Sequence, residues 1–414
     1  MIRFTNSIIM RKKILLVWDI WIWKKWWYHI GDESMFFYNF TALSHEKTYD
    51  IYATSRDISH NYIPSTKEIY RIYFKNGFFG MLKLFLFITF RQLFPKRSKL
   101  SNIIKTIKYI DYVIISWWGN LNSIWSWHLY FRFLITYFAR KYKKKIYISA
   151  QTVGPLYNLI DTYFVRKMYT WTIFFATRDK TFSLKYLTPY TSKITICYDD
   201  AFQTQNDIYP VPKDKNIKYI WWSVHQDFSE HNNKKLKNII DAIDSFYQKD
   251  INKHYMLPHL FDNQDRIDIH FMKQIKNNWD FILNYATLEK KRKESWVRFE
   301  HIIESYTGNM DFIITTRYHA AVFALKHWKI PFMIYRNTYE KEKFTWLLDT
   351  LWLSLHKHIL FDVNGSNASI KRNILYIEKN QQKLRNQISE SIQSINYKNI
   401  FINHFIINDQ HITP

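Results

Sequence analysis

The stretch FIITTRYHAAVFAL, residues 312–325, contains the pattern that decides the fold of this chain. It begins with four apolar or β-branched residues, which predict a short buried strand. The residues after Arg317 fit a helix that packs through Ala321, Ala324 and Leu325. A strand that leads directly into a helix is the repeating unit of parallel α/β sheets, so this stretch predicts an α/β fold.

The same alternation of short apolar runs and helical patterns extends along most of the chain. Candidate strands lie at 14–17, 50–53, 112–116, 146–150, 172–176 and 193–197, and again at 217–223, 253–257, 281–285 and 332–335. The polar stretch 203–215 between the two groups contains prolines and predicts a linker. We therefore expect two doubly wound, Rossmann-like domains facing a cleft, with ligands at the carboxyl ends of the strands. The expected bounds are 10–205 and 216–362, with a polar C-terminal helix at 366–396.

Tryptophan is abundant and glycine is scarce. The 414 residues include 17 Trp and 7 Gly, whereas glycine usually makes up about 7% of a protein. Several tryptophans follow predicted strands, in the loop 18–27 and at Trp117-Trp118, where tight turns favour glycine. An AT-rich genome that reads UGA as glycine would give this pattern if those codons were translated as tryptophan, and a TGG codon at Trp117 or Trp118 would contradict this hypothesis. The alternative is a natural Trp-rich protein whose aromatic side chains line a sugar groove or a core.

The formal net charge is +24, with 59 basic and 35 acidic residues. Such a charge suits an anionic partner: a phosphorylated substrate, a nucleic acid or an acidic membrane surface. The lysines are scattered, and AT-rich codon bias accounts for most of them. Because no nucleic-acid module accompanies the charge, we expect no nucleic-acid partner.

Cysteine usage and the N-terminal residues bear on the compartment. The single Cys197 excludes an intramolecular disulfide and a metal site built from cysteines. Residues 11–17 resemble the start of a cytoplasmic α/β protein without a signal peptide. The apolar stretch 78–90 is shorter than the roughly 20 residues that span a bilayer. It favours a helix in the core or over a loop, and peripheral contact with the inner face of the membrane is the alternative.

Arg317 and His319 form the strongest candidate site. An arginine at a strand end can hold a phosphate or carboxylate through two parallel hydrogen bonds. A histidine two residues later can exchange a proton near neutral pH. The structural alternative is a histidine that satisfies backbone groups at the helix start. We favour the functional interpretation because both residues lie where α/β folds bind ligands.

A second motif, residues 151–155 (QTVGP), leaves the predicted strand 146–150. Gly154 permits a tight turn, and Pro155 suits the first position of the next helix. The backbone N–H groups of that helix start would form an anion site. The motif is weak on its own, because many turns between a strand and a helix contain Gly-Pro.

Arg178 follows another predicted strand. It is either a second anion clamp or a structural partner of Asp199 or Asp200, and Asp179 is a natural helix N-cap.

Asp32 opens a helix after the first loop, where the alternative to ligand binding is a capping role. His225 and His259 lie near strand ends and are secondary candidates. We find no metal-ligand spacing, nucleophile elbow or Walker loop, and we expect no bound metal.

Taken in order over roughly residues 14–353, these motifs resemble the polysaccharide pyruvyl transferase family. The matching positions are Gly31-Asp32-Glu33, Ser116-Trp117-Trp118-Gly119-Asn120, Gln151-Thr152-Val153-Gly154-Pro155, Arg178-Asp179, Asp200-Ala201-Phe202 and Arg317-Tyr318-His319-Ala320. The family tends to have glycine where this chain has Trp117-Trp118, Trp328 and Trp352, as the UGA hypothesis predicts.

The resemblance implies a GT-B-like fold in which the C-terminal helix crosses back to the first domain. It also implies transfer of the enolpyruvyl group of phosphoenolpyruvate to sugar hydroxyls of a polysaccharide or its lipid-linked precursor. His319 and Arg317 are then the catalytic candidates. The implied substrate-binding residues are Arg178, Gln151, Gly154, Asn120 and Asp32. Phosphoenolpyruvate is the donor substrate, and no cofactor is expected.

Two other functions remain open from the sequence. One is a GT-B glycosyltransferase that uses a nucleotide sugar, since the same fold supports it. The other is a non-catalytic basic protein that binds an anionic polymer or membrane.

Overall fold

The computed structural model describes residues 11–20, 28–46, 48–55, 67–70, 72–90, 94–95, 98–116, 121–179, 182–187, 194–202, 214, 216–247, 252–261, 268–275, 279–295, 298–353, 356–395, 401–403 and 405–406. The chain folds into two compact units. Unit 1 comprises Met1–Trp21, Met35–Asp200 and Lys398–Pro414. Unit 2 comprises Ile22–Ser34 and Ala201–Tyr397. The chain therefore passes from one unit to the other more than once.

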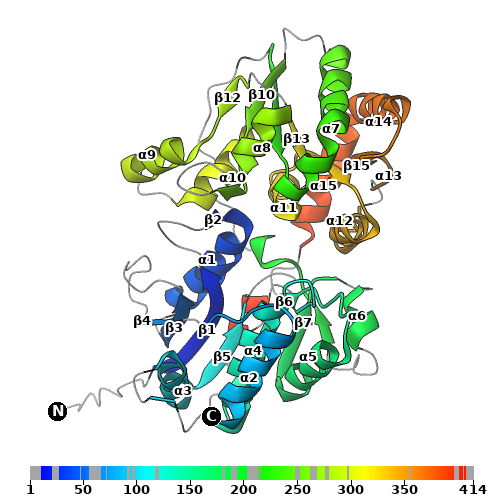
Figure 1. Ribbon diagram of the computed structural model, residues 1–414. Helices are drawn as coiled ribbons and strands as arrows, with labels where there is room; N and C mark the ends of the chain where they lie inside the picture. The colour runs from blue at the N-terminus through cyan, green and yellow to red at the C-terminus, as the bar shows by residue number, and fades with distance from the viewer. Residues whose placement is uncertain are drawn as a thin grey trace, which may run out of the picture. The chain divides into compact units, whose positions relative to one another are not determined.

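Unit 1 is built on a seven-stranded parallel sheet with the order β4-β3-β1-β5-β6-β7-β8 (Figure 1). Its strands are β1 (Lys12–Ile20), β3 (Tyr49–Ser55), β4 (Lys67–Tyr70), β5 (Tyr112–Ile115), β6 (Lys145–Gln151), β7 (Phe174–Thr177) and β8 (Ile194–Ile196). In the register, Ile14 of β1 lies opposite Ile51 on one side and Tyr112 on the other. From β1 the chain adds β3 and β4 on one side and then returns to add β5 on the other. The strand order therefore reverses between β1 and β5.

Helices cover this sheet, and some of them begin at side-chain caps. The helices are α1 (Ile30–His45), α2 (Phe78–Thr89), α3 (Lys99–Tyr109), α4 (Ser126–Lys141), α5 (Leu159–Trp171) and α6 (Phe182–Leu187), with a short 3₁₀ helix η3 (Asp200–Phe202). For example, Ser98 Oγ accepts a hydrogen bond from Ser101 N at the start of α3, and Asn158 Oδ1 accepts one from Asp161 N at the start of α5. These are the residue types that satisfy unpaired N–H groups at helix starts. Helix α4 is apolar on most sides and is almost entirely buried in the unit 1 core.

Unit 2 repeats this architecture with a six-stranded parallel sheet in the order β12-β10-β9-β13-β14-β15 (Figure 1). Its strands are β9 (Lys218–Ser223), β10 (Asn252–Met256), β12 (Phe281–Ile282), β13 (Phe312–Thr315), β14 (Ile330–Tyr335) and β15 (Leu360–Asp362). A separate antiparallel pair joins β2 (Tyr28–His29) to β11 (Leu260–Phe261). The order reverses between β9 and β13. Two parallel sheets of this kind confirm the predicted Rossmann-like α/β fold.

The helices of unit 2 include the one predicted from residues 312–325. They are α7 (Gln226–Tyr247), α8 (Asp268–Ile275), α9 (Tyr285–Ser295), α10 (Phe299–Asn309), α11 (Tyr318–Lys326), α12 (Thr338–Thr350), α13 (His356–Ile359), α14 (Asn367–Lys379) and α15 (Gln381–Gln393). The predicted C-terminal helix is in fact two helices, α14 and α15, which meet at Asn380.

The chain beyond α15 returns to unit 1. Phe405 is buried, and its ring centroid lies 4.9 Å from that of Tyr147 and 5.6 Å from that of Tyr112. Phe401 is also buried, and its ring centroid lies 5.8 Å from that of Phe174. Aromatic pairs at such distances contribute to a core beyond their buried area. The last segment of the chain therefore completes the core of the first unit.

Two tryptophans occupy backbone positions that favour glycine. Trp328 and Trp352 follow the ends of α11 and α12 with φ of 58° and 56°. Each of the two helices ends in a Schellman motif. At the end of α11, Lys329 N donates to Ala324 O at 2.8 Å. By contrast, Trp221 and Trp222 are fully buried in β9, so they do not fit the glycine interpretation. The structure thus separates tryptophans at glycine-like positions from tryptophans that form the core.

We expect Trp352→Gly to stabilise the protein by about 1 kcal/mol, because glycine adopts this φ without steric cost. The Trp352 side chain is 80% exposed, so little packing is lost. Urea unfolding measures the effect, and Trp352→Ala is the matched control because it removes the indole and keeps Cβ. An equal gain from alanine would show that the indole, and not the backbone angle, is responsible.

Within the described residues, each helix is too short or too polar to cross a membrane.

Candidate active site

The candidate site in unit 2 forms where the strand order reverses, between the carboxyl ends of β9 and β13. Thr316 N donates to Ser223 O at 3.1 Å, and His225 N donates to Thr316 Oγ1 at 2.7 Å. These bonds join the two loops that follow the strands. The crevice at such a reversal is where doubly wound α/β sheets bind ligands. The predicted strand and helix of residues 312–325 therefore place Arg317 and His319 at the carboxyl end of the sheet, where the sequence analysis expected ligands to bind.

Arg317 is the N-cap residue of α11 and is only 6% exposed. Its Nη2 forms an ion pair with Asp268 Oδ1 at the start of α8, and Asp268 is completely buried. The Nε of Arg317 is buried and makes no hydrogen bond within the described structure. A buried guanidinium that retains an unused N–H donor can still bind an anion by donating a hydrogen bond to it.

His259 lies beside this ion pair. Its Nδ1 is 3.1 Å from Ser223 Oγ, and its backbone N donates to Asp268 Oδ2 at 3.0 Å. Burial lowers the pKa of His259 well below its ordinary value, and the positive charge of Arg317 lowers it further. His259 is therefore neutral at physiological pH. Its Nε2 is also buried without a hydrogen-bond partner in the described structure.

His319 lies in the first turn of α11 and is 3% exposed. Gly31 approaches its ring so closely that a Cβ built on Gly31 would lie 2.0 Å from His319 Nδ1. Only glycine fits at position 31 without moving the histidine. The sequence indicated Gly31 only as part of a helix start, so this contact explains why a glycine is found there.

A buried ionic network supports the far end of α11. Lys326 Nζ and His327 Nε2 lie 2.6 and 2.9 Å from Glu304 Oε1. Burial acts to raise the pKa of Glu304, but the charge of Lys326 and the hydrogen bond from His327 outweigh it and lower that pKa to about 2. Glu304 therefore stays ionised and fixes α11 to α10.

The other sequence candidates come after several strands of the unit 1 sheet and at the start of α1. The loop 21–27 and the loop 117–120, which contains Asn120, come after β1 and β5 in the chain and lie outside the described residues. Asp32 lies in the first turn of α1, as predicted, and its side chain is likewise outside the described part.

Arg178 makes the ion pair with Asp199 that the sequence offered as its structural role. Its Nη1 lies 2.5 Å from Asp199 Oδ2, its Nε donates to Thr152 Oγ1 at 2.9 Å, and it is 4% exposed. Asp179 accepts hydrogen bonds from Ser183 N and Oγ at 2.7 and 2.5 Å, which agrees with the predicted capping role.

The segment 151–155 differs in part from its prediction. Gly154 has φ of 96°, as a tight turn requires, but Pro155 does not open the next helix. Helix α5 begins at Leu159, because Asn158 is the stronger N-cap. The expected anion site at Gly154 therefore lacks its helix start. Gln151 is completely buried, and its side-chain amide makes no hydrogen bond within the described structure.

Asp200 is the centre of a buried polar cluster that joins α1, β6 and η3. Its Oδ2 accepts hydrogen bonds from Asn39 Nδ2 and Ser149 Oγ, both at 2.9 Å. Burial raises the pKa of Asp200 to about 7, the negative charge of Asp199 adds to this, and the hydrogen bond from Asn39 opposes it. Such a group changes its protonation near neutral pH.

Asp200 should make the folded state less stable as the pH rises from about 4 to 7. In this range the folded protein keeps the proton while the unfolded chain loses it, so the free energy of unfolding falls by about 4 kcal/mol. We expect Asp200→Asn, which stays neutral, to abolish this fall in urea titrations at pH 4 and pH 8. Asp50→Asn at the surface is the control. Parallel wild-type and Asp200→Asn profiles would show that Asp200 does not titrate in this way.

The sequence did not indicate Asp268 or Ser223. Each becomes part of the site only through tertiary contact, and the one local signal is an acidic residue in the first turn of a helix. Among the described residues, we find no group of three His, Cys, Asp or Glu side chains placed to hold a metal ion.

The site can bind an anion and exchange a proton. Arg317 supplies a buried positive charge, Asp268 fixes its orientation, and two histidines lie nearby. This set fits acid–base chemistry on a small anionic substrate.

In a comparison with protein families, residues 19–339 match a family model described as polysaccharide pyruvyl transferase. No curated protein sequence matches the chain significantly.

Solved structures resemble the whole chain at low sequence identity. S. aureus MnaA with UDP has 12% identity and a TM-score of 0.56, over 96% of this chain and 95% of that one. Anabaena Alr3699/HepE with UDP has 10% identity and a TM-score of 0.56, over 97% and 99%. UDP-GlcNAc 2-epimerase from Neisseria meningitidis, bound to UDP-GlcNAc, has 10% identity and a TM-score of 0.54, over 97% and 100%. These similarities show a GT-B-like fold and carry no function with them.

Proposed function

Because this chain belongs to the polysaccharide pyruvyl transferase family, we propose that it transfers the enolpyruvyl group of phosphoenolpyruvate to sugar hydroxyls. The acceptor is a cell-surface polysaccharide or its lipid-linked precursor, and the products are a pyruvate ketal and phosphate. The reaction takes place in the cytoplasm, at the inner face of the membrane when the acceptor is lipid-linked. Phosphoenolpyruvate is a substrate, and the scheme needs neither metal nor cofactor.

The observation that carries this proposal is that Arg317 and His319 both lie at the start of α11. This helix begins where the strand order of a doubly wound sheet reverses. The donor carries a phosphate and a carboxylate, and both attract a guanidinium. The unused Nε of Arg317 is the donor group that we assign to them. Asp268 keeps Arg317 in place, although its own negative charge weakens the attraction for an anion.

The chemistry needs a proton donor and a proton acceptor. A proton added to the methylene carbon of phosphoenolpyruvate leaves a cation at the adjacent carbon, which a sugar hydroxyl attacks as it loses its proton. The C–O bond to phosphate then breaks, and a second hydroxyl closes the ketal and releases its proton. One of the two released protons replaces the proton given to the methylene, and the other leaves with phosphate. We assign the proton transfers to His319 and the stabilisation of the leaving phosphate to Arg317.

Arg317→Lys should weaken the binding of phosphoenolpyruvate by about tenfold or more, because an ammonium cannot reproduce the planar fork of a guanidinium. Isothermal titration calorimetry with phosphoenolpyruvate, and separately with UDP-sugars, measures this. Arg336→Lys is the matched control, because Arg336 pairs with Glu340 on α12. Binding of a UDP-sugar in place of phosphoenolpyruvate would replace this proposal with a glycosyltransferase. Salt-sensitive binding of an anionic polymer that does not depend on Arg317 and His319 would indicate a non-catalytic role.

A further inference from the structure

Helix α2 exposes most of its apolar side chains. Only Gly80 and Leu84 are buried, while Phe78, Phe79 and Phe85 are 65%, 71% and 59% exposed. The same surface includes Leu82, Leu86 and Phe90. The half-buried Met81, Phe87 and Ile88 also pack against the core, and the other apolar side chains of α2 face outward. Large exposed apolar patches usually mark a contact with another partner.

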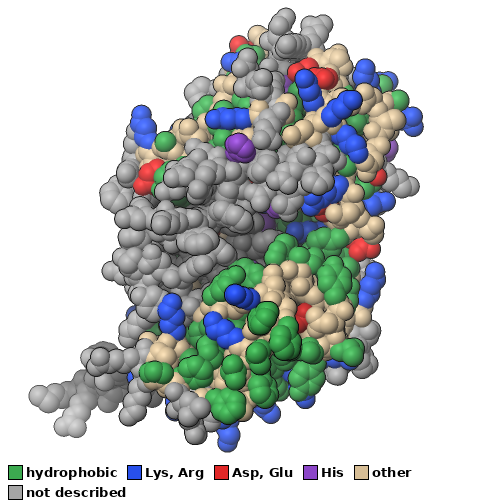
Figure 2. All heavy atoms as spheres, in the orientation of Figure 1, with side chains coloured by type: hydrophobic (Ala, Val, Ile, Leu, Met, Phe, Trp, Pro, Cys, Tyr) green, Lys and Arg blue, Asp and Glu red, His purple; other side chains and the backbone are tan. Residues whose placement is uncertain are grey.

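The patch extends beyond α2. Helices α2 and α5 both pack against α4, and the N-terminal end of α5 is exposed as well. Its exposed residues are Tyr157, Leu159, Ile160 and Tyr163. Figure 2 shows hydrophobic side chains gathered over this face of unit 1, with basic side chains among them. We call the exposed residues of α2, Phe90 and the start of α5 the apolar face.

The chain around α2 carries positive charge alone. Residues 69–110 contain nine Lys and Arg and no Asp or Glu. Two of these basic residues are exposed: Lys75, shortly before α2, and Lys99, the first residue of α3. An aromatic helix with basic neighbours and no acidic ones has the composition of helices that lie in the interface of anionic membranes.

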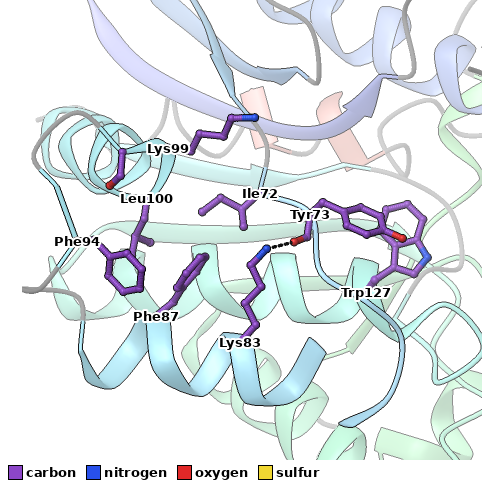
Figure 3. Close-up of a pocket in the computed structure, with 9 residues that line it drawn as sticks. Ile72, Tyr73, Lys83, Phe87, Phe94, Lys99, Leu100 and Trp127 are labelled. Atoms are coloured by element: carbon purple, nitrogen blue, oxygen red, sulfur yellow. Dashed lines mark hydrogen bonds between the residues drawn. The ribbon is translucent and has the colours of Figure 1, made fainter. Parts of the chain in front are cut away.

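A cavity of about 420 Å³ opens beneath α2 (Figure 3). Its walls present apolar and polar surface in similar amounts and come from α2, α3, α4 and the segments 72–73, 94 and 98. The wall residues are Ile72, Tyr73, Phe87, Phe94, Leu100 and Trp127, with Lys83, Ser98 and Lys99. Lys83 Nζ donates to Tyr73 O at 2.6 Å. The combination of apolar side chains and lysines suits an amphiphile that bears a negative charge.

We propose that the apolar face docks this protein on an anionic lipid bilayer, with α2 in the plane of the interface. Its phenylalanines would enter the boundary between headgroups and acyl chains, and the exposed Lys75 and Lys99 would contact lipid phosphates. Helix α2 has 12 residues, too few to span a bilayer, so it lies on the membrane and does not cross it.

The positive charge around the apolar face favours an anionic bilayer over a second copy of the chain as the partner of this face. A twofold contact through the apolar face would bring two basic surfaces together, and their repulsion would oppose it. An anionic membrane instead supplies both an apolar phase and negative charge, which together match the two properties of this face.

Vesicle flotation tests the proposal. The full chain should bind phosphatidylcholine vesicles that contain about one-third phosphatidylglycerol, and it should bind pure phosphatidylcholine vesicles much more weakly. The triple variant Phe78→Ser/Phe79→Ser/Phe85→Ser should reduce binding by about 100-fold. Lys75→Gln should reduce it by about fivefold.

The control removes exposed apolar side chains elsewhere. Ile196→Ser/Leu375→Ser changes residues that are 39% and 42% exposed outside the apolar face, and it should bind as the wild type does. Unaltered vesicle binding by the triple variant, or no vesicle binding by the wild type, would overturn the proposal. So would a wild-type dimer in analytical ultracentrifugation that the triple variant loses, with no vesicle binding by either. The assay contains no phosphoenolpyruvate and no acceptor, so it can fail or succeed independently of the proposed transferase activity.

Discussion

His319→Ala is expected to lower kcat by about 10²- to 10⁴-fold while phosphoenolpyruvate still binds with nearly the wild-type affinity. His319 is the residue to which we assign the proton transfers, and alanine cannot carry a proton. Binding should persist because Arg317 and its partner Asp268 remain in place. Phosphate release in the presence of acceptor measures kcat, and calorimetry measures donor binding.

Two further variants sharpen this prediction. Gly31→Ala leaves the histidine chemically intact but places Cβ 2.0 Å from its Nδ1, so the ring must move and activity should fall. His358→Ala is the matched control, since His358 stacks on Tyr376 away from α11. Near-normal turnover of His319→Ala would refute the acid–base assignment.

Asp268→Ala should destabilise the protein by about 3–5 kcal/mol, because it leaves the guanidinium of Arg317 buried without its counter-charge. It also removes the acceptor for the backbone N of His259. Donor affinity need not fall in proportion, since loss of the negative charge favours an anion beside Arg317. Urea unfolding gives the first quantity, and calorimetry with phosphoenolpyruvate gives the second.

A double-mutant cycle separates the lost charge pairing from lost packing. Replacing both partners, as in Arg317→Met/Asp268→Leu, removes both buried charges and should cost less stability than Asp268→Ala alone. If the double variant is instead the less stable one, the ion pair is not what makes Asp268 important.

The sequence was sufficient for the parts of the site that depend on local pattern. Arg317 and His319 could be located because a buried strand and a helix fix them at one turn, and the alternation of such units predicted two parallel sheets. Asp268 could not be located, because it meets Arg317 only through folding across 49 residues. The same limit left the choice for Arg178 open until its contact with Asp199 was seen.

The start of α5 shows how a local rule can mislead. Gly154-Pro155 has the composition of a helix start, but Asn158 caps the helix three residues later.

The tryptophans show a similar limit of sequence analysis. Trp222 is a core residue whose indole donates to His254 Nδ1, whereas Trp352 occupies a backbone angle that suits glycine. Composition alone could not separate these two kinds of tryptophan.

The return of the C-terminal segment to unit 1 bears on how the protein is made. A ribosome releases the N-terminal strands first, and domains generally fold as they emerge. Here the rings of Tyr112 and Tyr147 contact Phe405, which is synthesised after the whole of unit 2. These contacts can form only when the chain is nearly complete. The first unit to appear is therefore the last to be completed. Until then the aromatic surface that Phe405 covers stays exposed, as it would in any chain cut short within α15.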